Sequence, residues 1–208
     1  MRIIAGEFRG RILLPPKGET TRPVTDRVKQ SLFDCLAPEL PDAVVFDCFA
    51  GTGSMGLESL SRGAAKAFFF EADCSAAAIL RRNIDALKVA DRSLVITADI
   101  FDVGWALPTG SKSGGQCPPY KACTLLFLDP PYRFLRERRA DMQRLAQHFV
   151  EHHLAPNAIV VFRHDAADAL DLPPLVRYDL RKYGSMIVEL LTCPSTPTNS
   201  SPPPTPLG

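Results

Sequence analysis

The sequence predicts an α/β fold, a three-layer, doubly wound and mostly parallel sheet, and three observations predict it. From residue 43 onward, short apolar runs alternate with helical patterns. A glycine-rich turn follows the first run, and acidic residues recur where successive runs end. Parallel strands need crossover connections, which are usually helices, so this alternation favours a parallel sheet. The expected strands are 43–47, 67–71, 94–98, 124–128, 158–162, 176–182 and 186–192.

Ahead of the sheet, residues 2–14 alternate in the manner of a β-hairpin. Thr25 or Asp26 is placed to cap a helix that runs to about Leu36. We expect residues 1–38 to form an N-terminal arm. The apolar side chains expected to pack within its hairpin are Ile3, Ile4, Ile12 and Leu13.

Within the expected main domain, residues 39–193, helical patterns at 54–62, 74–87 and 136–153 connect the strands. The last two strands are joined only through residues 183–185. Such a short link permits an antiparallel pair and excludes a parallel crossover, so the sheet should end in an antiparallel hairpin.

Two segments are expected outside this core. The loop 108–121 is rich in glycine and serine, and the tail 194–208 is a Pro/Ser/Thr low-complexity segment that should be disordered. The six cysteines form no CxxC pair, which favours reduced thiols. The chain begins without a signal-peptide pattern, and no apolar stretch approaches the ~20 residues of a membrane span. We therefore expect a cytoplasmic protein without membrane contact.

Positive charge is concentrated at the start of the chain. The whole sequence has a net charge of +1. Residues 1–30 alone carry seven Lys or Arg against three acids, which leaves the remainder mildly acidic. A basic segment on an acidic body suits binding of a polyanion by one face, although a merely solvated segment is the alternative. The candidate phosphate-binding residues are Arg2, Arg9, Arg11, Arg22 and Arg27.

The turn after the first expected strand is glycine-rich. Gly51 and Gly53 allow a close approach of the backbone to a ligand, and the next helix offers free N–H groups. With Gly56 the spacing becomes G-x-G-x-x-G, and Glu71 lies 18 residues beyond Gly53, where a ribose-binding acid is expected. Nicotinamide, flavin and adenosylmethionine proteins all use such turns, and a purely structural turn is the remaining alternative.

Acidic residues at four successive strand ends argue against a dehydrogenase. Asp47, Glu71, Asp99 and Asp129 are separated by 24, 28 and 30 residues, one strand–helix unit each. They should therefore line the sheet edge where ligands bind. We expect Asp47 to hold the glycine loop, Glu71 to bind ribose hydroxyls, Asp99 an adenine amine and Asp129 the substrate. The motifs contain no obvious lysine partner for these carboxylates.

The motif Asp129-Pro130-Pro131-Tyr132 directly follows the apolar run 125–128. Asp129 and the Pro130 carbonyl can each accept an N–H of an exocyclic amine, and Tyr132 can stack on the ring that carries the amine. The alternative is a strand that ends in proline beside an incidental acid and aromatic ring. On the first interpretation, the motif is a substrate site for a nucleobase.

Together, these motifs resemble the adenosylmethionine-dependent methyltransferases that modify exocyclic amines, in which D-P-P-[YF] follows the cofactor motif. More narrowly, the chain resembles the bacterial small-subunit (16S) ribosomal RNA guanine-N2 methyltransferases of the RsmD type. The resemblance runs from residue 2 to about 192, while the loop 108–121 and the tail after 193 depart from it. The segments that carry it are 2–6, 9–11, 22–28, 32–33, 47–53 and 129–132.

This resemblance implies transfer of a methyl group from S-adenosylmethionine to guanine N2 in ribosomal RNA. It also implies a monomer that needs no metal and acts on RNA within a small-subunit assembly particle. The implied catalytic residues are Asp129, Pro130 and Tyr132. The implied cofactor-binding residues are Asp47, Phe49, Ala50, Gly51, Gly53, Glu71, Asp99 and Ile100.

Other interpretations remain beside this one. An adenine-N6 methyltransferase acting on DNA or RNA would also use D-P-P-Y, and a nucleotide-binding ribosome-assembly factor would catalyse no transfer. The pattern H-x-x-E-H at 148–152 matches a zinc motif, but a solvated helix face explains it better. Cys117 or Cys123 could be the nucleophile of a cytosine-C5 enzyme, but Cys117 lies in a Gly/Ser loop and Cys123 enters an expected buried strand. Trp105 is expected to pack in a loop.

Overall fold

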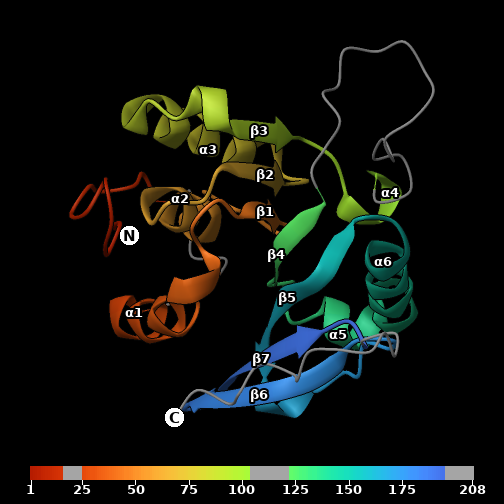
Figure 1. Ribbon diagram of the computed structural model, residues 1–208. Helices are drawn as coiled ribbons and strands as arrows, with labels where there is room; N and C mark the ends of the chain where they lie inside the picture. Colours follow the sequence, from red (N-terminus) through yellow and green to blue (C-terminus); the bar gives the residue numbers. More distant parts are fainter. Residues whose placement is uncertain (16–24, 104–121, 195–208) are drawn as a thin grey trace.

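The computed structural model describes residues 1–15, 25–103 and 122–194 and contains a sheet of the order β3-β2-β1-β4-β5-β7-β6 (Figure 1). All seven expected strands are confirmed, with ends that shift by a few residues. The strands are β1 (Val44–Asp47), β2 (Lys66–Phe70), β3 (Ser93–Ile96), β4 (Cys123–Leu128), β5 (Leu154–Asp165), β6 (Val176–Tyr183) and β7 (Met186–Thr192).

The sheet is mostly parallel and ends antiparallel, as predicted. β1 pairs in parallel with β2 and β4, β2 with β3, and β4 with β5. β7 is antiparallel to both β5 and β6, so it lies between them. The short link 183–185 explains the β6–β7 pairing. Only the structure shows that β7, and not β6, adds to β5.

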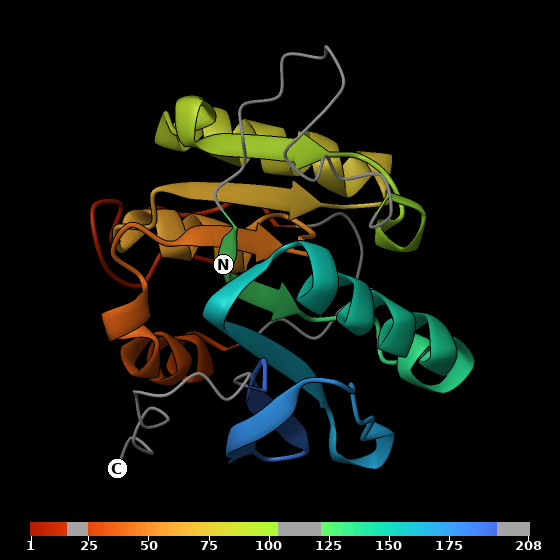
Figure 2. The same ribbon diagram turned by 45° about the vertical axis from the view of Figure 1, so that its right-hand side comes forward.

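Helices cover both faces of the sheet. In Figures 1 and 2, α1 to α3 lie on one side of the strands and α4 to α6 on the other. The α-helices are α1 (Asp26–Cys35), α2 (Ser54–Ser61), α3 (Cys74–Leu87), α4 (Ile100–Val103), α5 (Phe134–Glu137) and α6 (Arg139–His152). Short 3-10 helices are η1 (Ala37–Glu39), η2 (Ala90–Arg92) and η3 (Ala166–Asp168). The helix expected over 136–153 is thus two helices, interrupted at Arg138, where φ is −126°.

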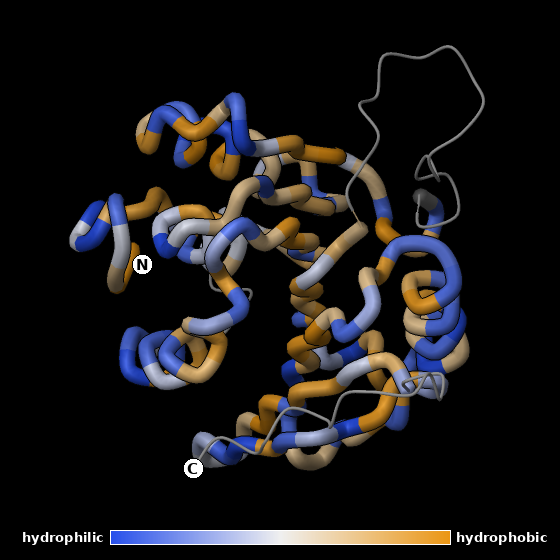
Figure 3. Tube along the Cα trace, viewed as in Figure 1, coloured by the Kyte–Doolittle hydropathy of each residue, from blue (hydrophilic) through white to orange (hydrophobic). Residues whose placement is uncertain are grey.

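Two hydrophobic cores result from the alternation of side chains along the strands. Leu125 and Phe127 of β4 pack in the core beneath α1 to α3, whereas Leu126 and Leu128 pack in the core beneath α4 to α6. Successive side chains of a strand point to opposite faces, so a strand covered on both faces is apolar at every position. Figure 3 shows this hydrophobic character along the strands of the sheet.

The two arms of the N-terminal hairpin are joined by a β-bridge between Arg2 and Ile12 and by backbone hydrogen bonds such as Ile3 N to Arg11 O at 2.9 Å, and the hairpin packs on the sheet domain. Ile3 and Leu13 are buried in the same core as Phe33 of α1. The expectation that Ile12 packs is wrong, because its side chain is 83% exposed. Ile12 precedes the inward-facing Leu13, and alternate residues of an extended chain face opposite sides.

The remaining expectations concern single residues. Thr25 caps α1, accepting a hydrogen bond from Val28 N. The expected solvated face of α6 is wrong at His148, which is buried and whose Nε2 lies 3.3 Å from His153 Nε2.

The described residues contain no group of three or more side chains able to hold a metal, and none of their helices is long and apolar enough to cross a membrane. Trp105, Cys117, the loop 108–121 and the tail from 195 lie outside the described residues.

Candidate functional site

Four acidic residues lie at the carboxyl ends of four neighbouring strands. Asp47 ends β1, Glu71 follows β2, Asp99 follows β3, and Asp129 follows β4. The strand order β3-β2-β1-β4 places these ends side by side on one edge of the sheet. The carboxyl groups of Asp129 and Glu71 both raise the pKa of Asp47. The geometry therefore joins the glycine turn and the D-P-P-Y motif in one acidic site.

Asp47 organises the start of α2. Its side chain is 2% exposed, and its Oδ2 accepts a hydrogen bond from Gly56 N at 3.0 Å. Burial is the main cause that raises the pKa of Asp47 to about 7, although the Gly56 bond opposes the rise. A Cβ at position 56 would lie 2.2 Å from the Phe69 ring, so glycine is required for α2 to pack against β2.

The Glu71 side chain fixes the glycine loop through a hydrogen bond to the loop's backbone. Its Oε2 accepts from Gly51 N at 2.7 Å, and its Oε1 accepts from Asp73 N at 2.8 Å. Gly51 has a φ of +55°, and a Cβ built there would meet nothing within 4 Å. The loop is therefore open on its outer side, where a ligand can approach the backbone closely. Gly53, with a φ of +87°, precedes α2.

Asp99 lies under an arginine that sequence analysis missed. Its Oδ1 accepts from Phe101 N at 3.0 Å, and its Oδ2 accepts from Arg138 Nη1 at 2.9 Å. Arg138 stacks 3.8 Å above the Phe101 ring. Phe49 and Phe134 complete an aromatic cluster with Phe101, with ring centroids 5.9 to 6.2 Å apart. Arg138 reaches Asp99 because the chain breaks between α5 and α6, which the helical pattern did not indicate. Ala50 and Ile100 are buried beside these residues.

Asp129 is likewise paired with an arginine. Arg163 of β5 donates from Nε to Asp129 Oδ1 at 2.6 Å and from Nη2 to Oδ2. Burial raises the pKa of the Asp129 carboxyl, and Arg163 opposes that rise. No lysine partner was expected for these acids, and the structure pairs Asp99 and Asp129 with arginines that lie outside the motifs. Neither partner is a lysine, and each comes from a different element. Pro130 is buried and Tyr132 is half-buried.

The proposed phosphate-binding arginines that the structure describes are all exposed, but they differ in whether they pair with an acid. Arg9, Arg11 and Arg27 are exposed. Arg2 is exposed as well, but its Nε lies 2.7 Å from Asp26 Oδ2. Arg22 lies outside the described residues. The structure therefore presents Arg9, Arg11 and Arg27 most openly to a polyanion.

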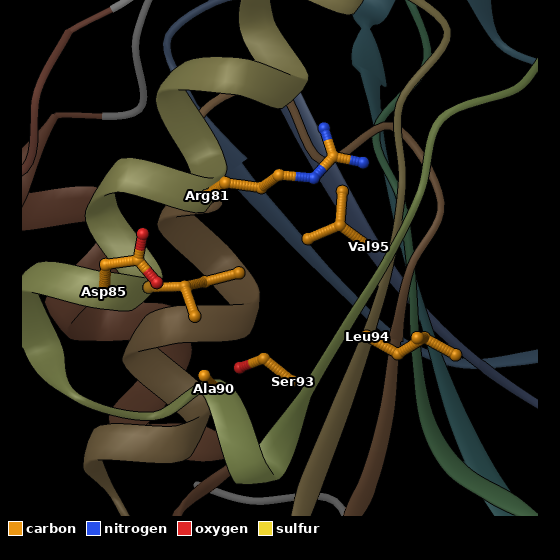
Figure 4. Close-up of a pocket in the computed structure, with 7 residues that line it drawn as sticks. Arg81, Asp85, Ala90, Ser93, Leu94 and Val95 are labelled. Carbon is orange, nitrogen blue, oxygen red and sulfur yellow. The ribbon is translucent and has the colours of Figure 1, made fainter.

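Two further features, Cys123 and a pocket beside α3, do not belong to the acidic site. Cys123 is fully buried in β4, and burial raises the pKa of its thiol, so it is not an activated nucleophile. A pocket of about 330 Å³ lies between α3, η2 and β3 (Figure 4). There Arg81 extends from α3 towards Val95. No residue that lines this pocket belongs to the acidic site at the carboxyl ends of the strands.

The strand order, the glycine turn after β1 and the acids after β1 to β4 define a Rossmann-like methyltransferase fold. The model of the family described as Conserved hypothetical protein 95 matches residues 1–192, and the chain belongs to that family. This match, with the relatives below, confirms the resemblance to the RsmD type.

Two curated relatives are named Ribosomal RNA small subunit methyltransferase D. The protein of Escherichia coli K12 is 40% identical over 133 residues, which are 64% of this chain and 61% of the relative. That of Haemophilus influenzae Rd is 38% identical over 135 residues, 64% of this chain and 65% of the relative. The chain thus matches less than two thirds of the length of these relatives.

Solved structures extend the similarity over almost the whole chain. An Escherichia coli protein described as a candidate methyltransferase has a TM-score of 0.75 and 30% identity, and the match covers 93% of this chain and 97% of that one. An RNA methyltransferase of Salinibacter ruber in complex with S-adenosyl-L-homocysteine has a TM-score of 0.55 and 16% identity, covering 86% of this chain and 98% of that one. The second likeness concerns the fold alone.

Proposed function

We propose that this protein transfers a methyl group from S-adenosylmethionine to the exocyclic N2 amine of a guanine in small-subunit ribosomal RNA. The observation that carries the proposal is the position of Asp129-Pro130-Pro131-Tyr132 at the end of β4, beside the glycine turn that ends β1. A nucleobase amine held by the motif would lie next to a nucleoside bound at the turn. The names of the curated relatives support ribosomal RNA as the substrate.

The residues of the site fit S-adenosylmethionine. Glu71 and Asp99 offer carboxylate oxygens for ribose hydroxyls and an adenine amine, and the half-buried Phe49 offers a ring. The backbone is open at Gly51. A row of carboxylates favours a cationic cofactor and disfavours a pyrophosphate, which argues against a dinucleotide. When bound, S-adenosylmethionine supplies an electrophilic methyl group on its sulfonium.

The D-P-P-Y motif prepares the amine for attack. The lone pair of a nucleobase amine is delocalised into the ring, so the amine is a poor nucleophile. Hydrogen bonds from its two N–H groups to Asp129 and the Pro130 carbonyl favour a pyramidal nitrogen and aim its lone pair. In direct transfer the nitrogen would form a bond to the methyl carbon as the carbon–sulfur bond of the sulfonium breaks, with S-adenosylhomocysteine as the leaving group, and the nitrogen would lose one proton to solvent. Most of the acceleration comes from positioning and oriented acceptors, while Tyr132 stacks on a base taken out of its helix.

The substrate atom is identified by mass spectrometry of nucleosides. Purified protein and S-adenosylmethionine are incubated with small-subunit RNA and particles from a host that lacks the gene. We expect N2-methylguanosine to form, and Asp129→Asn to abolish it. The matched control is Asp179→Asn, because Asp179 also pairs with an arginine, Arg181 on β6, and this variant should keep full activity.

The same experiment separates the alternatives. If the product is N6-methyladenosine, the base that accepts the methyl group is adenine and not guanine. No methylated nucleoside from any RNA or particle, with intact binding of the cofactor, would favour a non-catalytic assembly factor. Transfer to particles but not to naked RNA would place the protein within small-subunit assembly.

A further inference from the structure

Arg163 lies beside the substrate motif through the register of two strands. Leu128 of β4 pairs with Phe162 of β5 in parallel, so the next residues, Asp129 and Arg163, are neighbours at the carboxyl ends. The guanidinium makes a two-point contact with the carboxylate. Both side chains are largely buried, with 14% exposure for Arg163 and 20% for Asp129. Bidentate geometry fixes the plane and the direction of the carboxylate.

We infer that Arg163 is a positioning residue for methyl transfer, which keeps Asp129 ionised and oriented as the acceptor for the amine of the substrate. This inference rests on the proposed function. An ionised carboxylate has about four acceptor positions, of which Arg163 takes two and leaves the others for N–H groups. A protonated carboxyl would instead present an O–H donor towards an amine that must itself donate.

The surroundings of Asp129 make such a partner necessary. Burial raises the pKa of the Asp129 carboxyl. The charged group that acts on the pKa of Asp129 is Arg163 on β5. After burial, Asp129 itself raises the pKa of Asp47 at the end of β1, and Glu71 does the same. Burial disfavours the ionised form of Asp129, and Arg163 is the cation of the described residues that opposes this effect.

One nitrogen of Arg163 takes no part in the contact with Asp129. Nη1 is buried and has no hydrogen-bond partner among the described residues. A buried donor without a partner costs free energy. The fold accepts this cost at the position where the guanidinium meets the D-P-P-Y carboxylate.

The protonation of Asp129 is measured directly by carboxyl-carbon NMR titration of protein labelled at aspartate, with Asp129→Asn to assign the signal. Removal of the cation in Arg163→Met should raise the midpoint of Asp129 by about one pH unit or more. Arg163→Lys keeps the charge and should return the midpoint to within about half a unit of wild type. Arg181→Met, which breaks a comparable pair with Asp179 on β6, is the matched control.

Kinetics supply the second measurement. In Arg163→Met the acidic limb of the kcat profile should move to higher pH, and kcat should fall about tenfold or more while the cofactor Kd stays within about twofold. Arg163→Lys should recover the limb and only part of kcat, because it lacks the two-point geometry. Cofactor binding shows that each variant is folded.

The possible failures are distinguishable. Wild-type protein that methylates no RNA overturns the proposed function, whatever the titration shows. Wild-type transfer with the same Asp129 midpoint in Arg163→Met and wild type overturns the inference about Arg163. If Arg163→Met does not fold, an Arg163→Lys variant with full kcat overturns the positioning role.

Discussion

Asp47 shows how a single residue can serve a site at the expense of stability. Its carboxyl is buried, and its pKa rises from 3.8 to about 7, with burial as the main cause. The folded protein therefore holds this proton more tightly than the unfolded chain does. Its contribution to stability is full below pH 3.8 and is lost as the pH rises to about 7. The role of the buried Asp47 is structural at this point, because its Oδ2 accepts a hydrogen bond from Gly56 N at the start of α2.

We predict that Asp47→Asn changes the pH dependence of stability. The amide oxygen can keep the bond to Gly56, but the titration disappears. The free energy of unfolding of the variant, relative to wild type, should rise between about pH 4 and pH 7, by up to about 1.4 kcal/mol per pH unit. Urea unfolding at several pH values measures the difference, with the exposed Asp91→Asn as control. A constant difference across this range would show that Asp47 is not the titrating group.

Glu71 allows a second test at the scale of one residue. Because it holds Gly51 N and is expected to bind the ribose, Glu71→Ala should raise the Kd of S-adenosylmethionine about tenfold or more. RNA affinity should stay almost unchanged. Calorimetry measures the cofactor and filter binding the RNA, with the exposed Glu151→Ala on α6 as control. Equal cofactor affinity in Glu71→Ala and the control would contradict the assignment.

At the scale of elements, Glu58 of α2 joins the N-terminal hairpin to the helix that follows the glycine loop. The Glu58 side chain is fully buried. Its Oε2 accepts from Ile4 N at 2.8 Å and lies 3.1 Å from Lys29 Nζ of α1. Its Oε1 accepts from Ala5 N and from Arg62 Nε. One carboxylate of α2 thus binds donors from the hairpin, from α1 and from Arg62, the residue that follows α2, and it fixes the hairpin to the side of the fold that carries the glycine loop.

We predict that Glu58→Gln strongly destabilises the protein. The amide would place N–H groups against N–H donors and leave the buried Lys29 without its counter-charge. The free energy of unfolding should fall by about 3–5 kcal/mol, as measured by urea unfolding. Asp34→Asn removes the other, 57% exposed partner of Arg62 and should cost less than about 1 kcal/mol. Similar losses in the two variants would mean that Glu58 does not anchor the hairpin.

At the scale of the whole molecule, charge is divided between two regions. The carboxylates gather where β1 to β4 end, whereas the exposed Arg9 and Arg11 lie on the hairpin. Because the hairpin packs on α2, these arginines are presented on a rigid surface. We propose that this surface binds RNA phosphates, while the acidic edge receives the base and the cationic cofactor.

We predict that the double variant Arg9→Gln/Arg11→Gln flattens the salt dependence of RNA binding. Each neutralised phosphate releases counterions, so the slope of log K against log salt should fall by about one to two units. Stability and cofactor affinity should persist because both side chains are exposed. Arg82→Gln, exposed on α3, is the control. An unchanged slope with full methylation would move the RNA site away from the hairpin, for example to Arg133 and Arg139.

The sequence by itself determined the seven strands, the alternation of strands and helices that makes most of the sheet parallel, and the acidic residues at the strand ends. Strands covered on both faces are continuously apolar, and glycine turns and D-P-P-Y are local in the chain. Such features depend on neighbours in sequence, and the structure contains all seven expected strands. The antiparallel end likewise followed from a link too short for a crossover.

Only the tertiary structure decided the partners of the carboxylates. Arg163 is 34 residues from Asp129, and Arg138 is 39 from Asp99, and each pair depends on strand register or on a helix break. Glu58 meets Ile4 across 54 residues through the packing of the hairpin on α2. Opposite charges attract at any sequence separation once the fold brings them together out of water, where their attraction is strongest. A sequence displays the charges but not the register that pairs them.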